Sequence, residues 1–183
     1  TSVAETVDSR PAGMRNNNPG NLKYDADVQW SGLVGPSENT DQGTPQAVFE
    51  SPALGMRATA KLAANKYDLG LKTPRDMITA EKGWTPGYLA AAENIANDMG
   101  IGLDDDLQLD KPERQLSFTR ALISQEHGPA SRAYTDDDID RGWVDAGKRA
   151  NLSGRATSPT EGGVGRFGQG GLGRGLDSPS ETS

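Results

Sequence analysis

The C-terminal segment 151–183 most limits what this chain can fold into. It contains 9 glycines between Gly154 and Gly175, together with serines, charged residues and isolated apolar residues. Such a segment buries too little apolar surface to offset the entropy lost when it becomes ordered. We therefore expect one folded domain over 13–150, preceded by a mobile N-terminal arm over 1–12 and followed by a disordered, extended tail over 151–183.

Three helices are predicted from one local pattern, in which a hydroxyl residue that can cap a helix is followed by proline. Proline suits the first helical position because its φ is already helical and an N–H there would have no partner within the helix. Apolar residues then recur with helical spacing before a glycine. The starts are Ser51-Pro52, Thr73-Pro74 and Thr85-Pro86, and the first and third helices should end at Gly70 and Gly100.

Two further helices are expected nearer the C-terminus. The first should be capped by Asp110 and Glu113 and should end at Gly128. The second should run from Asp136 to about Arg149, with acidic residues in its first turn and basic residues in its last. Its buried stripe is predicted to be Ile139, Trp143 and Ala146.

A small β element is predicted between Leu22 and Phe49. Leu22–Tyr24 and Ala47–Phe49 are short runs with extended character, and the residues between them show little periodicity. The fold class predicted from these patterns is α+β, mainly α.

Composition excludes several kinds of site. The net charge of −7 argues against a general nucleic-acid binder, which needs clustered Lys and Arg. The absence of cysteine excludes disulfides and zinc–thiolate sites, and no stretch has the roughly 20 apolar residues of a membrane span. The loop Asp104–Asp106 lacks the spacing of a calcium-binding loop and is interpreted as solvated. No metal and no cofactor is therefore predicted.

The segment Arg15–Tyr24, with the sequence Arg-Asn-Asn-Asn-Pro-Gly-Asn-Leu-Lys-Tyr, predicts an ordered turn. Its amide side chains have two interpretations, which are compatible with each other. They can satisfy buried backbone groups, or they can line a groove for a ligand rich in acetamido and hydroxyl groups. The candidate ligand-binding residues are Asn16, Asn17, Asn18, Asn21 and Tyr24.

Glu126 is the candidate catalytic residue. It lies in the last turn of an apolar helix, just before Gly128. The negative end of the helix dipole disfavours an ionised carboxylate there, so the pKa of Glu126 should be raised, as a general acid requires. An exposed glutamate at a helix end is the alternative. His127, the only histidine, is interpreted as an exposed neighbour rather than a catalyst, because no serine or cysteine nucleophile motif accompanies it.

The sequence resembles the lysozyme-like domain of bacteriophage virion proteins. The resemblance covers roughly residues 13–143, and the asparagine motif is its most specific part. Members of this family are described as virion structural proteins or as peptidoglycan-degrading lytic transglycosylases. The resemblance is carried by Arg-Asn-Asn-Asn-Pro-Gly-Asn-Leu at 15–22, the helix from Pro52, Tyr88-Leu89-Ala90-Ala91 and Gln-Glu-His-Gly at 125–128.

The resemblance implies cleavage of the β-1,4 bond between N-acetylmuramic acid and N-acetylglucosamine. Glu126 would protonate the leaving oxygen and then, as the carboxylate, accept the proton of the muramoyl 6-hydroxyl while a 1,6-anhydro ring closes. Tyr88 would contact the substrate. No second carboxylate is then required, although Asp104–Asp106 could supply one for ordinary hydrolysis.

The order of the motifs departs from that of most such enzymes, in which the glutamate helix comes before the asparagine segment. Glu126 comes last here, which suggests a circular permutation. The alternative is that Glu5, which lies before the asparagines, is the acid. Glu126 is preferred because nothing around Glu5 in the polar arm would raise its pKa.

The expected partners are bacterial peptidoglycan and, through the tail, other virion proteins. The expected location is a phage virion that acts on the host cell envelope when the genome enters the cell. No signal peptide is recognised at the N-terminus, so delivery by the particle is expected. A peptidoglycan-binding module without catalysis and a non-catalytic virion structural protein with a lysozyme-like fold are the alternatives.

Overall fold

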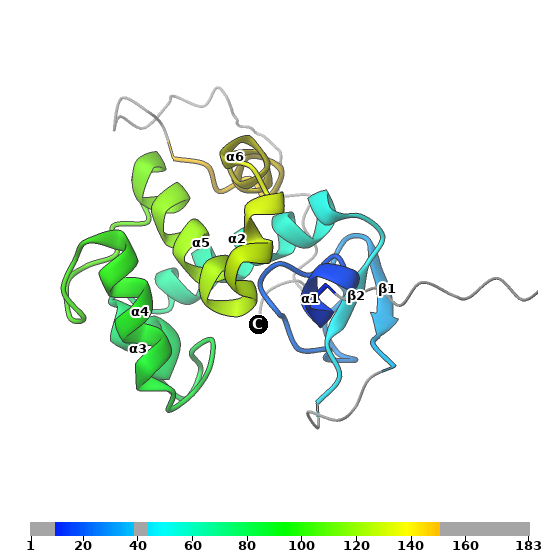
Figure 1. Ribbon diagram of the computed structural model, residues 1–183, viewed down its shortest axis with the longest axis horizontal. Helices are drawn as coiled ribbons and strands as arrows, with labels where there is room; N and C mark the ends of the chain where they lie inside the picture. Colours follow the sequence, from blue (N-terminus) through cyan, green and yellow to red (C-terminus); the bar gives the residue numbers. More distant parts are fainter. Residues whose placement is uncertain (1–9, 39–43, 151–183) are drawn as a thin grey trace, which may run out of the picture.

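The computed structural model describes residues 10–38 and 44–150, and it is mainly helical (Figure 1). A two-stranded antiparallel sheet lies at one side of the helices. The predicted mainly α architecture with a small β element is thus confirmed. The helices are α1 (Ala12–Arg15), α2 (Pro52–Asp68), α3 (Pro74–Thr79), α4 (Leu89–Met99), α5 (Pro112–His127), the 3₁₀ helix η1 (Gly128–Ala133) and α6 (Asp136–Asp145).

Two of the predicted Pro-led helix starts are confirmed. The Ser51 hydroxyl accepts a hydrogen bond from the Leu54 N–H at the start of α2, and Thr73 caps α3 in the same way through the Asp76 N–H. The third start is wrong, because α4 begins at Leu89 and not at Pro86. Gly87 has φ +80° and donates its N–H to the Thr79 carbonyl, which keeps 85–88 in a turn.

The boundaries of α5 and α6 also differ from the prediction. Lys111, not Asp110, is the N-cap of α5, and it makes no side-chain capping bond because Pro112 fills the first helical position. The last helix ends at Asp145, and Gly147, with φ +72°, prevents it from reaching Arg149. The predicted apolar stripe of α6 is confirmed as buried: Ile139, Trp143 and Ala146.

The sheet has a different first strand from the one predicted. Strand β1 (Leu33–Pro36) pairs with β2 (Ala47–Phe49), with an irregularity between Leu33 and Gly35. The segment Leu22–Tyr24 contributes only an isolated bridge between Lys23 and Gln46. The reason is local, because the Asn18 side chain accepts a hydrogen bond from the Leu22 N–H and donates one to the Leu22 carbonyl.

Helix α2 connects the two parts of the core. Its buried residues pack against α6 on one side, and Ala58 packs beneath the sheet with Trp30 and Phe49 on the other. Trp84, in the loop after α3, contacts both apolar clusters. The helical part and the part that carries the sheet are therefore joined through one long helix and one aromatic side chain.

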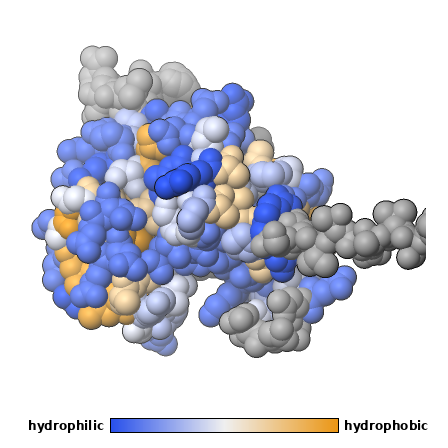
Figure 2. Space-filling view, viewed as in Figure 1, coloured by the Kyte–Doolittle hydropathy of each residue, from blue (hydrophilic) through white to orange (hydrophobic). Residues whose placement is uncertain are grey.

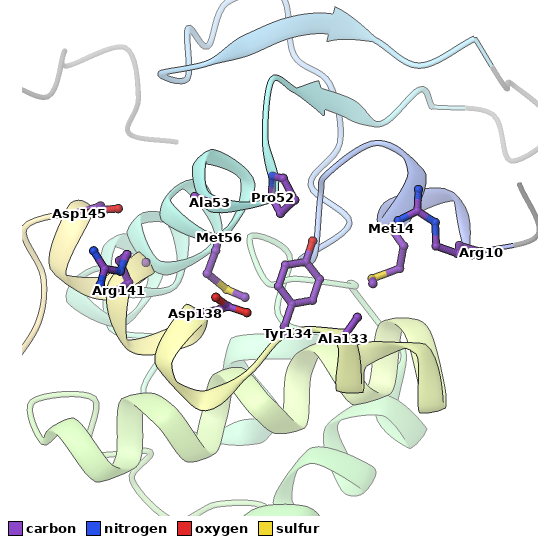
Figure 3. A pocket seen from close by; sticks show the side chains of 11 residues that line it. Arg10, Met14, Pro52, Ala53, Met56, Ala133, Tyr134, Asp138, Arg141 and Asp145 are labelled. Atoms are coloured by element: carbon purple, nitrogen blue, oxygen red, sulfur yellow. The ribbon is translucent and has the colours of Figure 1, made fainter.

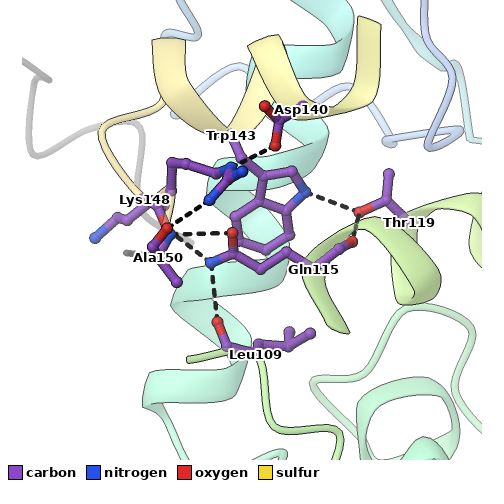
Figure 4. Close-up of polar contacts among 8 residues, drawn as sticks. Leu109, Gln115, Thr119, Asp140, Trp143, Lys148 and Ala150 are labelled. Atoms are coloured by element: carbon purple, nitrogen blue, oxygen red, sulfur yellow. Dashed lines mark hydrogen bonds and ion pairs between the residues drawn. The ribbon is translucent and has the colours of Figure 1, made fainter. Parts of the chain in front are cut away.

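The end of the described chain is fastened to α5 (Figure 4). The buried Gln115 amide donates to the carbonyls of Leu109 and Lys148, at 2.9 and 2.8 Å, and accepts from the Ala150 N–H at 3.1 Å. Beside it, the Trp143 indole donates to the Thr119 hydroxyl. The folded region thus includes Ala150. The predicted tail over 151–183 lies outside the described residues, as does the predicted arm up to residue 9, whereas Ala12 belongs to α1.

Candidate functional site

Helix α5 carries Glu126 to its place in the structure. Phe118, Leu122 and Ile123 are fully buried along the helix and fix its position in the core. The helix ends at Gly128, whose φ of +60° turns the chain directly after His127. Glu126 is therefore held on a rigid element in the last helical turn, as the sequence predicts.

The asparagine segment forms an ordered turn after α1. Asn17 and Asn21 adopt left-handed conformations with φ of 56° and 52°, which asparagine tolerates better than most residues. The side chain of Asn18 is fully buried and bonds Leu22 and the Ala47 carbonyl. Asn17 donates to the Phe49 carbonyl at 2.9 Å. These two amides thus stabilise the backbone next to β2, in agreement with the structural interpretation of the motif.

The fourth asparagine of the motif contacts the candidate catalytic residue. The Asn21 Nδ2 donates a 2.6 Å hydrogen bond to the Glu126 Oε1. Burial raises the pKa of the Glu126 carboxyl above its usual range, and the hydrogen bond from Asn21 lowers it in part. The arrangement can therefore hold a proton on Glu126 closer to neutral pH than an exposed glutamate can.

His127 is buried, contrary to the exposed position predicted, and it joins the asparagine turn to the end of α5. Its Nε2 lies 2.8 Å from the Pro19 carbonyl oxygen, so Nε2 carries the hydrogen and donates it. Burial lowers the pKa of the His127 imidazole, which favours the neutral ring. Gly13 approaches this contact closely, because a Cβ on Gly13 would lie 2.1 Å from the Asn21 Oδ1 and 2.3 Å from the His127 Cε1.

A groove of about 480 Å³ has Asn21 among its lining residues, whereas Glu126 itself does not line it. Figure 2 shows this face hollowed between the part with α3 and α4 and the part that carries the sheet. The indole of Trp84 donates a 2.7 Å hydrogen bond to the Gly20 carbonyl and so connects the two sides. The groove is lined by Asn21, Leu22, Lys23, Asp25, Val28, Trp30, Leu62, Lys66, Leu69, Glu81, Lys82, Gly83, Trp84 and Pro86.

The other candidate ligand-binding residues lie around this site with different exposure. Asn16 makes a long hydrogen bond of 3.4 Å to Gln46 and lines a separate pocket next to β1. Tyr24 is half-buried, and Tyr88 is 50% exposed at the N-cap of α4. Neither tyrosine lines the groove. Their assignment as ligand-binding residues stays a prediction, and Glu5 lies outside the described residues.

The aspartates of the 104–106 loop are engaged with their surroundings. Asp104 pairs with Arg75, and Asp105 accepts from the Gly102 N–H. Asp106 accepts from the Tyr67 hydroxyl at 2.6 Å. Within 10–38 and 44–150, no group of three His, Asp or Glu residues could hold a metal ion.

A second pocket, of about 320 Å³, lies between the N-terminal turn of α2 and α6 (Figure 3). Met14, Met56 and Tyr134 form its apolar part, and Arg10 and Arg141 lie on either side of them. Burial raises the pKa of Tyr134 to about 12, so its hydroxyl stays protonated at neutral pH.

The described part of the chain contains no helix that could span a membrane.

Sequence reasoning missed Gly13 and Trp84 as residues of the site and placed His127 at an exposed position, whereas its side chain is buried. Each acts through a contact with a residue far away in the chain, and His127 and Pro19 are 108 positions apart. The single histidine and the few tryptophans could have drawn attention to two of them, but no local pattern indicates their partners.

Comparison with known proteins places the chain among bacteriophage proteins. Models of known protein families give no match. The chain is, however, 31% identical over 146 residues to Protein P5 of Pseudoalteromonas phage PM2, and the match covers 75% of this chain and 82% of the phage protein. Similarity over most of both chains shows common ancestry, so this chain belongs to the same family as Protein P5 of Pseudoalteromonas phage PM2.

Proposed function

We propose that this chain is a phage virion protein whose lysozyme-like domain cleaves bacterial peptidoglycan, as a lytic transglycosylase acting on the bond between N-acetylmuramic acid and N-acetylglucosamine. It would act on the host envelope while the genome enters the cell. The observation that carries the proposal is the half-buried Glu126 carboxyl group, which accepts a hydrogen bond from Asn21, a residue that lines the groove. The relationship to a phage protein supports the proposed origin of the chain.

The chemistry requires Glu126 in both protonation states. The protonated carboxyl donates to the glycosidic oxygen as the bond breaks, and the resulting carboxylate accepts the proton of the muramoyl 6-hydroxyl. That hydroxyl oxygen attacks the anomeric carbon, so the product ends in a 1,6-anhydro ring and no water is consumed. The raised pKa of Glu126 favours the first step, and the Asn21 amide stabilises the carboxylate formed before the second.

Glu126→Gln tests this proposal, with Glu113→Gln as a matched control in the exposed first turn of the same helix. Removal of a general acid typically costs about 10² to 10⁴ in rate, so we expect Glu126→Gln to abolish measurable release of muropeptides. The control should retain activity. Mass spectrometry of the products distinguishes anhydro ends from the reducing ends of a hydrolase.

A non-catalytic virion structural protein with the same fold is the second candidate. It is favoured by the internal use of Asn17 and Asn18, whose amides bond the protein backbone and not an open groove. Absence of any muropeptide product from purified, folded protein would support this candidate and would contradict the proposed enzyme.

A further inference from the structure

The groove next to Asn21 has a local charge opposite to that of the whole chain. Lys23, Lys66 and Lys82 line it, against the two carboxylates of Asp25 and Glu81. The full sequence has a net charge of −7. The local excess of positive charge attracts anionic groups to the groove, whereas the acidic remainder of the surface repels them.

Lys66 is the least exposed of the three lysines in this groove. It lies in the last turn of α2 and is only half exposed, and its Nζ donates to the Lys82 carbonyl oxygen. Among the described residues, no carboxylate lies within ion-pair distance of Lys66. Burial lowers the pKa of its ammonium group, and an anion bound beside it would favour the charged form again.

The rest of the groove suits a sugar that carries such an anion. The half-buried Trp84 supplies aromatic surface, and Asn21, which bonds Glu126, also lines the groove. Aromatic faces pack against the apolar faces of sugar rings, whereas an ammonium group binds a carboxylate. One continuous lining thus offers contacts to both parts of a glycan with charged substituents.

We propose that this groove binds the carboxylate-bearing substituents of an anionic glycan, such as the peptide stems of peptidoglycan, and that Lys66 is the residue that selects for them. This inference rests on the proposed function and adds the substrate class. A neutral oligomer of N-acetylglucosamine can make the contact with Trp84 but not the one with Lys66, and it therefore binds more weakly.

The test measures binding by isothermal titration calorimetry on the full chain carrying Glu126→Gln, so that no probe is cleaved. The probes are a peptide-substituted tetrasaccharide from peptidoglycan and the neutral N-acetylglucosamine tetramer. We expect the peptide-substituted probe to bind at least about 10-fold more tightly. Lys66→Met should reduce this preference to less than about 3-fold without weakening the neutral probe, and Lys66→Arg should retain it.

Lys111→Met is the matched control, because it removes the same charge at the exposed start of α5, far along the helix from Glu126. It should leave both affinities unchanged. Raising the salt from about 0.05 to about 0.5 M should reduce the preference in the chain with Lys66 intact, which tests the ion contact even if Lys66→Met does not fold.

The outcomes separate this inference from the proposed function. Equal affinity for both probes, a salt-independent preference, or a preference that survives Lys66→Met in folded protein would overturn the role of Lys66 while leaving glycan binding intact. Failure of both probes to bind would contradict the proposed function as well.

Discussion

Asn21 donates a 2.6 Å hydrogen bond to Glu126 across 105 positions of sequence. This contact joins the turn formed by the asparagine motif to the end of α5, and His127 reinforces the same junction through the Pro19 carbonyl. The two most informative motifs of the sequence therefore meet in one place. Substitutions at this junction should affect both the ionisation of Glu126 and the stability of the fold, and suitable variants distinguish the two effects.

Glu126→Gln should stabilise the folded protein at neutral and higher pH. Burial raises the folded-state pKa of Glu126, so the folded state binds the proton more strongly than the unfolded state does. The ionised carboxylate therefore costs stability, and this cost develops as the pH rises from the unfolded pKa, about 4.3, through the folded pKa. Gln is neutral and still accepts the hydrogen bond from Asn21.

Urea unfolding at pH 8 and at pH 4 measures this difference. The unfolding midpoint of Glu126→Gln should exceed that of the parent at pH 8, and the advantage should shrink towards pH 4. An advantage of the same size at both values would mean that ionisation of Glu126 does not cause it.

Gly13→Ala should damage both stability and the site. The added Cβ would lie 2.1 Å from the Asn21 Oδ1 and 2.7 Å from the Asn18 carbonyl oxygen, so the turn must shift. Overpacking of this kind costs about 1 to 3 kcal/mol, and movement of Asn21 should reduce muropeptide release.

Gly100→Ala provides the comparison for Gly13→Ala. Its Cβ would meet open space, and its φ of +72° alone should cost about 1 kcal/mol. It should therefore lose stability but keep activity. Thermal melting together with the activity assay distinguishes the two variants, and equal activity in both would argue against the role of Gly13.

Asn18→Ala should be far more harmful than Asn16→Ala. The first removes three hydrogen bonds and leaves buried groups of Leu22 and Ala47 without those partners, which should cost about 3 kcal/mol. The second removes only a 3.4 Å contact with Gln46 and should change stability by less than about 0.5 kcal/mol. Chemical denaturation measures both, and similar losses would refute a structural role specific to Asn18.

Gln115→Leu should loosen the end of the folded region. Gln115 bonds Leu109, Lys148 and Ala150, and leucine replaces none of these bonds, so we expect a loss of about 2 kcal/mol. Gln29→Leu, at an exposed position with one 3.3 Å contact, should lie within about 0.5 kcal/mol of the parent. Hydrogen exchange should also show faster exchange at the Ala150 amide in Gln115→Leu.

Local sequence signals determined most of the helices. Ser51-Pro52 and Thr73-Pro74 start helices, and Gly100 and Gly128 end them, because a cap satisfies backbone groups only a few residues away. The buried apolar stripe of α6 was predicted equally well, since a helical period depends only on residues within one segment. Where a nearby glycine competes, as Gly87 does, the same reasoning placed the start too early.

The position of Glu126 in the last turn of a helix was likewise determined by the sequence, but its surroundings were not. Only the tertiary structure decided that Asn21 bonds Glu126, that His127 bonds Pro19, and that β1 rather than Leu22–Tyr24 pairs with β2. The physical reason is distance along the chain. Burial and hydrogen bonding between segments depend on how the whole core packs, whereas helix caps and periods depend only on residues within one or two turns.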